Sequence, residues 1–197
     1  MLEAVIFDLN GVFLESEYLS DRMQQDYGVD SNEFIAALKD IMPKVRKPDA
    51  QNSFELWKPY LGKWGVQLNE KEFFDYWFSG EQLVPELLDY AKELREQGTQ
   101  VFILSNNFRE RTTYYREHFP EIFDSVDAVY FSWETGLIKP DEQAYQKILR
   151  DQKLKSENCA YFDDSKTNVQ VANSLGIKAF SYEGISKTKQ TIQELQK

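Results

Sequence analysis

Cysteine and histidine are almost absent from this sequence, which contains one of each. The single cysteine, Cys159, cannot form an internal disulfide, so we expect a reducing compartment and a cytoplasmic protein. Cys159 begins an apolar run, which favours a buried, unreactive thiol. His118 has no nucleophilic partner that the sequence can identify, and we assign it no catalytic role.

Long apolar runs and an excess of positive charge are also missing. No segment approaches the ~20 apolar residues of a membrane span, and the N-terminal apolar run, interrupted by Asp8, is too short for a signal peptide. Asp and Glu outnumber Lys and Arg by 33 to 23, and a net charge of −10 repels nucleic-acid phosphates. We therefore expect neither a membrane nor a nucleic-acid partner, and by default a monomer or weak homodimer.

The 197 residues, 42% of which are hydrophobic, fall into two regions with different sequence patterns. Residues 83–197 alternate helical patterns with short apolar segments, which is typical of a parallel sheet with crossover helices. Together with the first apolar segment, they predict an α/β fold, a Rossmann-like doubly wound parallel sheet. The predicted strands lie near residues 3–9, 100–105, 127–131, 159–163 and 177–181.

Residues 15–82 contain no pattern that favours a strand. They predict four helices near 16–27, 31–40, 51–63 and 69–79, with loops around Gly28, 43–48 and Gly65. We expect a helical cap, residues 15–82, inserted after strand one of a core formed by residues 1–14 and 83–197.

Polar residues stand where four of the apolar segments end, and the first of these residues is Asp8. The strand runs directly into this aspartate, and Gly11 then allows the backbone to turn sharply. A carboxylate can attack phosphorus and form an acyl phosphate, which divides one difficult displacement into two easier ones. We therefore predict that Asp8 is a nucleophile.

Asp163 and Asp164 end a later strand and favour a Mg²⁺ site, because Mg²⁺ binds hard oxygen ligands. Adjacent residues point in different directions. We expect Asp164 to be the direct ligand and Asp163 to act through water or on Lys139, with Asp8 and the main-chain carbonyl of Asn10 completing the site. Taken alone, the two aspartates would more often serve as a helix N-cap, but beside Asp8 the metal site is the favoured interpretation.

Ser105, Asn106 and Lys139 complete the predicted site. Ser105 and Asn106 end a strand, where their polar groups could hold phosphate oxygens or cap a helix over 108–118. Lys139 precedes Pro140 and a helix, and its charge would neutralise a transferring phosphoryl group. We predict that all three bind substrate and that Lys139 also assists catalysis.

In order and spacing, these segments resemble the four motifs of the haloacid dehalogenase-like hydrolase superfamily. The resemblance covers the core, and the cap only by its position and helical character. It implies a Rossmann-like core, a Mg²⁺ cofactor, an aspartyl-phosphate intermediate and phosphatase activity, and the paired aspartates favour this over metal-free dehalogenase chemistry. Residues 111–122 are similar to the subgroup with bacterial α-glucose-1-phosphatase and the phosphatase domain of soluble epoxide hydrolases. The motifs are Phe7-Asp8-Leu9-Asn10-Gly11-Val12, Leu104-Ser105-Asn106, Gly136-Leu137-Ile138-Lys139-Pro140-Asp141 and Phe162-Asp163-Asp164.

Asn10 departs from the family pattern, which has an acid/base aspartate at this position. An amide cannot hold or release a proton at neutral pH. Three interpretations stay open: a natural variant that uses water or another acid, a chain altered to trap a ligand, or a binding protein without turnover. Loss of a general acid typically lowers the rate by ~10²–10⁴-fold, so slow activity is compatible with Asn10.

The predicted cap should select the substrate, a small phosphorylated metabolite. Its many aromatic side chains could stack on a sugar phosphate, although a four-helix cap also needs such residues for its own core. Lys44, Arg46 and Lys47 could meet a second anionic group, although such a run is more often a solvated loop. The two hypotheses are a Mg²⁺-dependent phosphatase and a non-catalytic phosphate-ligand-binding or regulatory protein.

Overall fold

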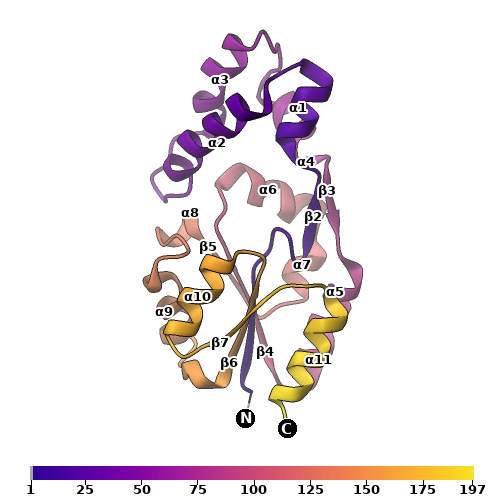
Figure 1. Ribbon diagram of the computed structural model, residues 1–197, viewed down its shortest axis with the longest axis vertical. Helices are drawn as coiled ribbons and strands as arrows, with labels where there is room; N and C mark the ends of the chain where they lie inside the picture. Colours follow the sequence, from indigo (N-terminus) through magenta and orange to yellow (C-terminus); the bar gives the residue numbers. More distant parts are fainter. Residues whose placement is uncertain (1) are drawn as a thin grey trace.

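Five apolar segments form a parallel sheet in the computed structural model, which describes residues 2–197 (Figure 1). The strand order is β5-β4-β1-β6-β7, so β1 is central, and Phe7 pairs with Ile103 on one side and Phe162 on the other. All five predicted strands are confirmed. They are β1 (Ala4–Phe7), β4 (Gln100–Ser105), β5 (Ala128–Phe131), β6 (Cys159–Asp163) and β7 (Lys178–Ser181).

Helices cover both faces of this sheet because successive side chains of a buried strand point to opposite faces. Val5 and Phe7 pack toward α5 (Pro85–Glu96) and α11 (Ile185–Leu195). Ala4 and Ile6 pack toward the opposite layer, and Cys159 is buried there as predicted. That layer contains α9 (Glu142–Asp151) and α10 (Lys166–Ser174). The predicted α/β, doubly wound fold is therefore confirmed.

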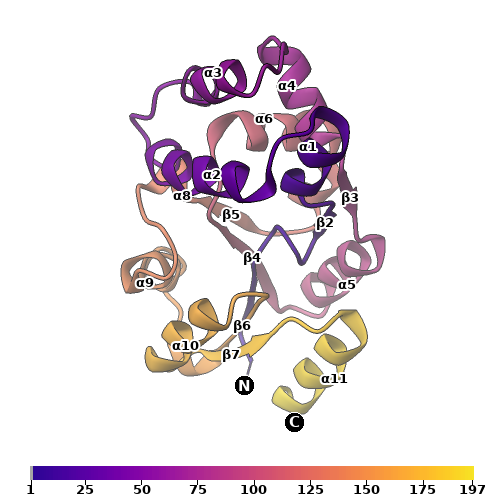
Figure 2. The ribbon, with the colours of Figure 1, turned by 45° about the horizontal axis from the view of Figure 1, so that its top comes forward.

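Four helices between β1 and α5 surround an apolar cluster of their own, and we call them the cap helices. The aromatic side chains of residues 54–78 contribute to this cluster, as a helical cap requires. Figure 2 brings these helices forward over the end of the sheet. They are α1 (Leu19–Tyr27), α2 (Ser31–Val45), α3 (Ser53–Lys63) and α4 (Glu70–Phe78).

Two expectations for residues 15–82 are wrong. Two short strands, β2 (Leu14–Ser16) and β3 (Glu81–Leu83), pair antiparallel at the two ends of this segment. Three residues are too few to show a periodicity. In addition, α2 continues through Pro43, because buried Met42 and Val45 fix its last turn to the cap cluster. The division of the chain into core and cap domains remains a prediction.

The carboxyl ends of the parallel strands face the cap helices, and both chain termini lie at the opposite end (Figure 1). The chain continues from β1 to β4 and β5 on one side and later crosses to β6 on the other. Such a switch point creates a crevice at the carboxyl ends of the strands. Within residues 2–197, no helix is both long and apolar enough to cross a bilayer. The remaining elements are α6 (Arg109–His118), α7 (Pro120–Asp124), α8 (Ser132–Thr135) and a 3₁₀-helix (Ser156–Asn158).

Candidate active site

Asp8 lies immediately beyond β1, at the predicted crevice. Its amide donates to the carbonyl of Phe162 at 2.9 Å, which continues the pairing with β6. Its carboxylate Oδ1 accepts from the amide of Leu9 at 2.7 Å. The loop then turns at Gly11, whose φ is +81°, and a Cβ on Gly11 would lie 2.6 Å from Oδ2 of Asp164. Glycine therefore brings the first loop against the aspartate that follows β6.

Lys139 joins the two strand ends. Its ammonium lies 2.9 Å from Oδ1 of Asp8 and 2.7 Å from Oδ2 of Asp163, and it donates to the hydroxyl of Tyr161 at 3.1 Å. The side chain is almost fully buried, so both ion pairs are shielded from solvent. The structure thus brings Asp8, Lys139 and Asp163, which are far apart in the sequence, into one cluster.

Asn106 fixes the backbone of Lys139. Its amide nitrogen donates to the carbonyl of Lys139 at 2.7 Å, and its amide oxygen accepts from the N–H of Lys139 at 2.8 Å. Both polar ends of the side chain are therefore occupied, and we assign Asn106 a positioning role. Ser105 is buried at the end of β4, and neither residue caps α6, which begins after Phe108 without a side-chain cap. The capping alternative is wrong for both.

Asp163 and Asp164 have different surroundings. Asp163 is fully buried and accepts from the amide of Ser165 at 2.7 Å, the side chain of Asn168 and the hydroxyl of Tyr161. Asp164 is exposed and lines the pocket between core and cap. The helix-capping alternative fits neither aspartate, because Ser165 is the N-cap of α10. Asp164 is therefore the one whose carboxylate is open to a ligand, and Asp163 holds Lys139 and Asn168.

The donor set at this site fits Mg²⁺. Carboxylate oxygens of Asp8, Asp163 and Asp164 lie within 4.8 Å of one another, so Asp8 and Asp164 are close enough to share one ion. All are hard oxygen donors, which Mg²⁺ prefers. Both carboxylate oxygens of Asp163 accept hydrogen bonds, whereas Lys139 and the amide of Leu9 contact only Oδ1 of Asp8. Asp8 and Asp164 are therefore the carboxylates available to a cation.

The carboxyl groups have opposed pKa shifts. Burial raises the pKa of Asp8 to about 6, with Lys139 acting against the shift and Asp163 adding to it. Partial desolvation of the carboxyl group and the charge of the neighbouring Asp163 also raise the pKa of Asp164. Burial by itself would raise the pKa of Asp163, but the charge and the hydrogen bond of Lys139 lower this pKa overall. Lys139 thus stabilises Asp163 as an anion most strongly, and Asp8 and Asp164 favour a further cation nearby.

Asn10 is held by two neutral partners that sequence reasoning missed. Its amide nitrogen donates to the hydroxyl of Tyr115 at 2.7 Å, and its oxygen accepts from the side chain of Asn107 at 3.0 Å. Asn107 is buried, and Ser132 bonds to its backbone. The only sequence signal for Asn107 is its place directly after Asn106, and Tyr115 has none.

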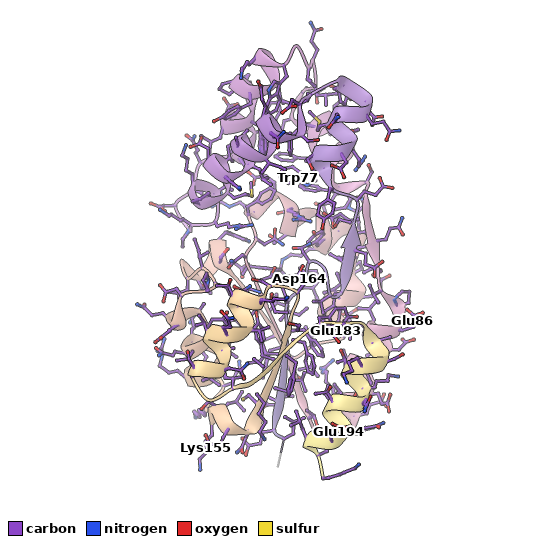
Figure 3. All side chains as sticks on the ribbon, in the orientation of Figure 1. Trp77, Glu86, Lys155, Asp164, Glu183 and Glu194 are labelled. Atoms are coloured by element: carbon purple, nitrogen blue, oxygen red, sulfur yellow. The ribbon has the colours of Figure 1, made fainter. Side chains whose placement is uncertain are left out.

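A pocket of about 480 Å³ lies between the core and the cap helices. Trp77 faces it from the cap and Asp164 from the core (Figure 3). Arg46 and Arg111 also line it. Lys47 is exposed, as expected for a solvated run, but this expectation is wrong for Arg46. Arg111, in α6, gives no sign in the sequence that it would reach the pocket.

A family model for haloacid dehalogenase-like hydrolases matches residues 2–176. The chain belongs to this family. It is therefore an enzyme of the hydrolase class by descent, and the resemblance predicted from the four motifs is confirmed.

Curated relatives of this haloacid dehalogenase-like hydrolase include phosphatases. A Mycobacterium tuberculosis phosphatase is 29% identical over 105 residues, which are 53% of this chain and 48% of the relative. The phosphorylated carbohydrates phosphatase of Thermotoga maritima is 25% identical and covers 90% of this chain and 83% of the relative. The bifunctional epoxide hydrolase 2 of Sus scrofa is 22% identical and matches all of this chain over 38% of its own length. The chain thus spans about half the length of the first of these relatives and less of the third.

Solved structures share the fold. A HAD family enzyme from Bacteroides thetaiotaomicron, in complex with magnesium and inorganic phosphate, superposes with a TM-score of 0.77 at 20% identity, over 93% of this chain and 95% of that one. A predicted HAD-like family hydrolase from Porphyromonas gingivalis superposes with a TM-score of 0.77 at 23% identity, over 98% of each chain.

Proposed function

We propose that this hydrolase is a Mg²⁺-dependent phosphatase that acts on a small phosphate monoester. The observation that carries the proposal is the cluster of Asp8, Lys139 and Asp164, which lies next to a pocket that Asp164 itself lines. The Thermotoga relative named for phosphorylated carbohydrates supports the substrate class, and the magnesium and phosphate in the Bacteroides structure support the cofactor. A sugar phosphate is one candidate substrate.

The residues suggest two displacements. A carboxylate oxygen of Asp8 attacks phosphorus, the ester P–O bond breaks, and the leaving oxygen takes up a proton. Water then attacks the phosphorus of the aspartyl phosphate, which releases inorganic phosphate and regenerates Asp8. Lys139 and Ser105 would bind phosphoryl oxygens, and Asn106 holds Lys139 in place.

Asp8, Asp164 and the carbonyl of Asn10 would hold Mg²⁺. When bound, the ion supplies positive charge that offsets the repulsion between the carboxylate and the incoming phosphate. Asp163 would keep Lys139 oriented between the two strand ends.

Asn10 favours a second candidate, a phosphate-ligand-binding or regulatory protein with little turnover. Its side chain is hydrogen-bonded to Tyr115 and Asn107, and an amide has no titratable proton to give to the leaving group. In the enzymatic proposal, water or another acid supplies that proton and the turnover is slow.

A phosphatase assay with Mg²⁺ and a panel of sugar, nucleotide and short-chain phosphates distinguishes the two candidates. We expect turnover that Asp8→Ala abolishes and that a chelator suppresses. The matched control is Asp49→Asn, which removes an exposed carboxylate outside the pocket lining. Tight ligand binding with no turnover by the unaltered chain would instead support the binding protein.

A further inference from the structure

Arg46 carries a charge that the protein itself leaves uncompensated. It follows the last turn of α2 and lines the pocket, and its Nε is buried without a hydrogen-bond partner. Within the described chain, residues 2–197, no carboxylate forms an ion pair with it. A buried, unsatisfied donor on a cation is costly, so such a group is usually completed by a ligand.

The other arginine of the pocket differs in this respect. Arg111 donates through Nε to Oε1 of Glu81 at 2.9 Å, and a second guanidinium nitrogen contacts the same oxygen. Glu81 is itself buried. The charge of Arg111 is therefore balanced inside the protein, and the pocket retains the positive charge of Arg46. Burial and repulsion by Arg111 lower the pKa of Arg46 to about 10, although attraction by Asp8 acts against the shift, and Arg46 is still charged at neutral pH.

The pocket links Arg46 to the reaction centre. Asn10, Gly11 and Asp164 line its core side. Apolar side chains of the cap line the wall nearby: Phe34, Ile35, Leu38, Met42 and Trp77. A ligand whose phosphate reaches Asp8 would lay its organic part along this wall, with Arg46 available to any further group that it carries.

We propose that Arg46 binds a second anionic group of the substrate, either a carboxylate or another phosphoryl group. The inference rests on the proposed phosphatase function and narrows it to phosphate monoesters that carry an additional negative charge. Guanidinium has a planar set of donors that pairs with two oxygens of one anion. A neutral sugar hydroxyl would leave the charge of Arg46 without a counterion.

Matched substrate pairs test this inference: phenyl phosphate against 4-carboxyphenyl phosphate, and phenyl phosphate against 1,4-phenylene bisphosphate. We expect the unaltered enzyme to prefer one of the partners with a second anionic group in kcat/KM, and Arg46→Met to lower that preference about 10- to 100-fold, the usual range for a charge-assisted pair. The loss for phenyl phosphate should be much smaller than the loss for its partner, and circular dichroism verifies that the variant is folded. Arg46→Lys, which keeps the charge without the planar fork, should give an intermediate loss.

Lys47→Met is the matched control, because it removes the same charge one residue away from a side chain that is exposed and outside the pocket lining. An equal loss for both members of a pair in Arg46→Met would overturn the inference, since Arg46 would then serve the scissile phosphate. Turnover without preference would overturn it too. If the enzyme turns over nothing, the phosphatase proposal fails separately, and calorimetric titration with the same pairs still decides whether Arg46 selects ligands with a second anionic group.

Discussion

At the scale of single residues, Asn10 is the position where the chemistry of this chain differs from its family pattern. The side chain is fixed by the hydroxyl of Tyr115 and the amide of Asn107. Both partners can donate hydrogen bonds, so an aspartate in the same place would retain them. The surroundings of Asn10 are therefore compatible with the acid that the family uses.

Asn10→Asp should raise kcat, and the gain should depend on the leaving group. An alkyl alcohol needs a proton to depart, and a nitrophenol does not. We expect a gain of about 10²-fold for an alkyl phosphate and a much smaller one for p-nitrophenyl phosphate. Steady-state rates with Mg²⁺ measure both. Equal gains for the two substrates would mean that position 10 acts by geometry and not as an acid.

Asp8→Asn should stabilise the metal-free protein. A pKa of about 6 means that the folded state disfavours the charged carboxylate of Asp8. This penalty is full above about pH 6 and fades as the pH falls toward the ordinary value of 3.8. In EDTA at pH 7.5, we expect the free energy of unfolding to rise by about 1–3 kcal/mol, with the gain vanishing near pH 4.

Urea denaturation of Asp8→Asn and of the unaltered chain across pH measures this gain. Lower stability of Asp8→Asn at pH 7.5 would mean that the ion pair with Lys139 outweighs the cost of burial.

The sequence predicted the residues whose types alone define the chemistry, namely Asp8, Lys139, Asp163 and Asp164. It did not predict those that act through placement. Asn107 and Tyr115 carry no local signal, because their roles depend on which loops and helices meet at the site. Arg46 was named as a possible contact for a second anionic group, but its charged run favoured a solvated loop, and only the structure places it in the pocket lining. Asn106 was predicted at the site, but only the structure reveals that its amide faces the backbone of Lys139.

At the scale of elements, the β2–β3 ribbon connects the cap helices to the core. Glu81 of β3 accepts from Ser16 of β2 and from Arg111 of α6, so one buried carboxylate joins three elements. The sequence predicted the long helices and the buried strands, whose periodicity is clear. It missed this ribbon, since strands of three residues are fixed by their partners and not by a pattern.

Glu81→Ala should destabilise the protein by about 3–5 kcal/mol, because it leaves the charge of Arg111 unpaired in a largely buried site. Urea denaturation followed by circular dichroism measures the change. Lys147→Met serves as control: it breaks the Lys147–Asp151 pair of 2.8 Å along the surface of α9, and we expect no measurable effect. A similar midpoint for both variants would show that Ser16 and solvent compensate for Glu81.

At the scale of the whole molecule, aromatic contacts couple the cap to the core. Phe108 precedes α6 and is buried within the cap cluster, where its ring lies 5.3 Å from that of Trp77 and 6.1 Å from that of Phe78. Three of the four tryptophans belong to the cap helices or their ends, so tryptophan fluorescence reports mainly on the cap.

Phe108→Ala should lower the free energy of unfolding by about 3–5 kcal/mol. We expect the fluorescence transition in urea to precede the circular dichroism transition, because the cap loses its main aromatic anchor in the core. Phe102→Ala, which empties an equally buried position within the sheet, should move both transitions together. Coincident transitions in Phe108→Ala would show that the linking segments alone keep the cap and core cooperative.

Gly11 has an evolutionary consequence. One methyl group at that position would meet the Asp164 carboxylate at 2.6 Å. An alanine there would displace the aspartate without altering any acidic residue. A homologue with that substitution could therefore lose activity although all four motifs keep their charged residues. Whether a homologue retains the activity is therefore better judged from the residue at position 11 than from the presence of the acidic residues alone.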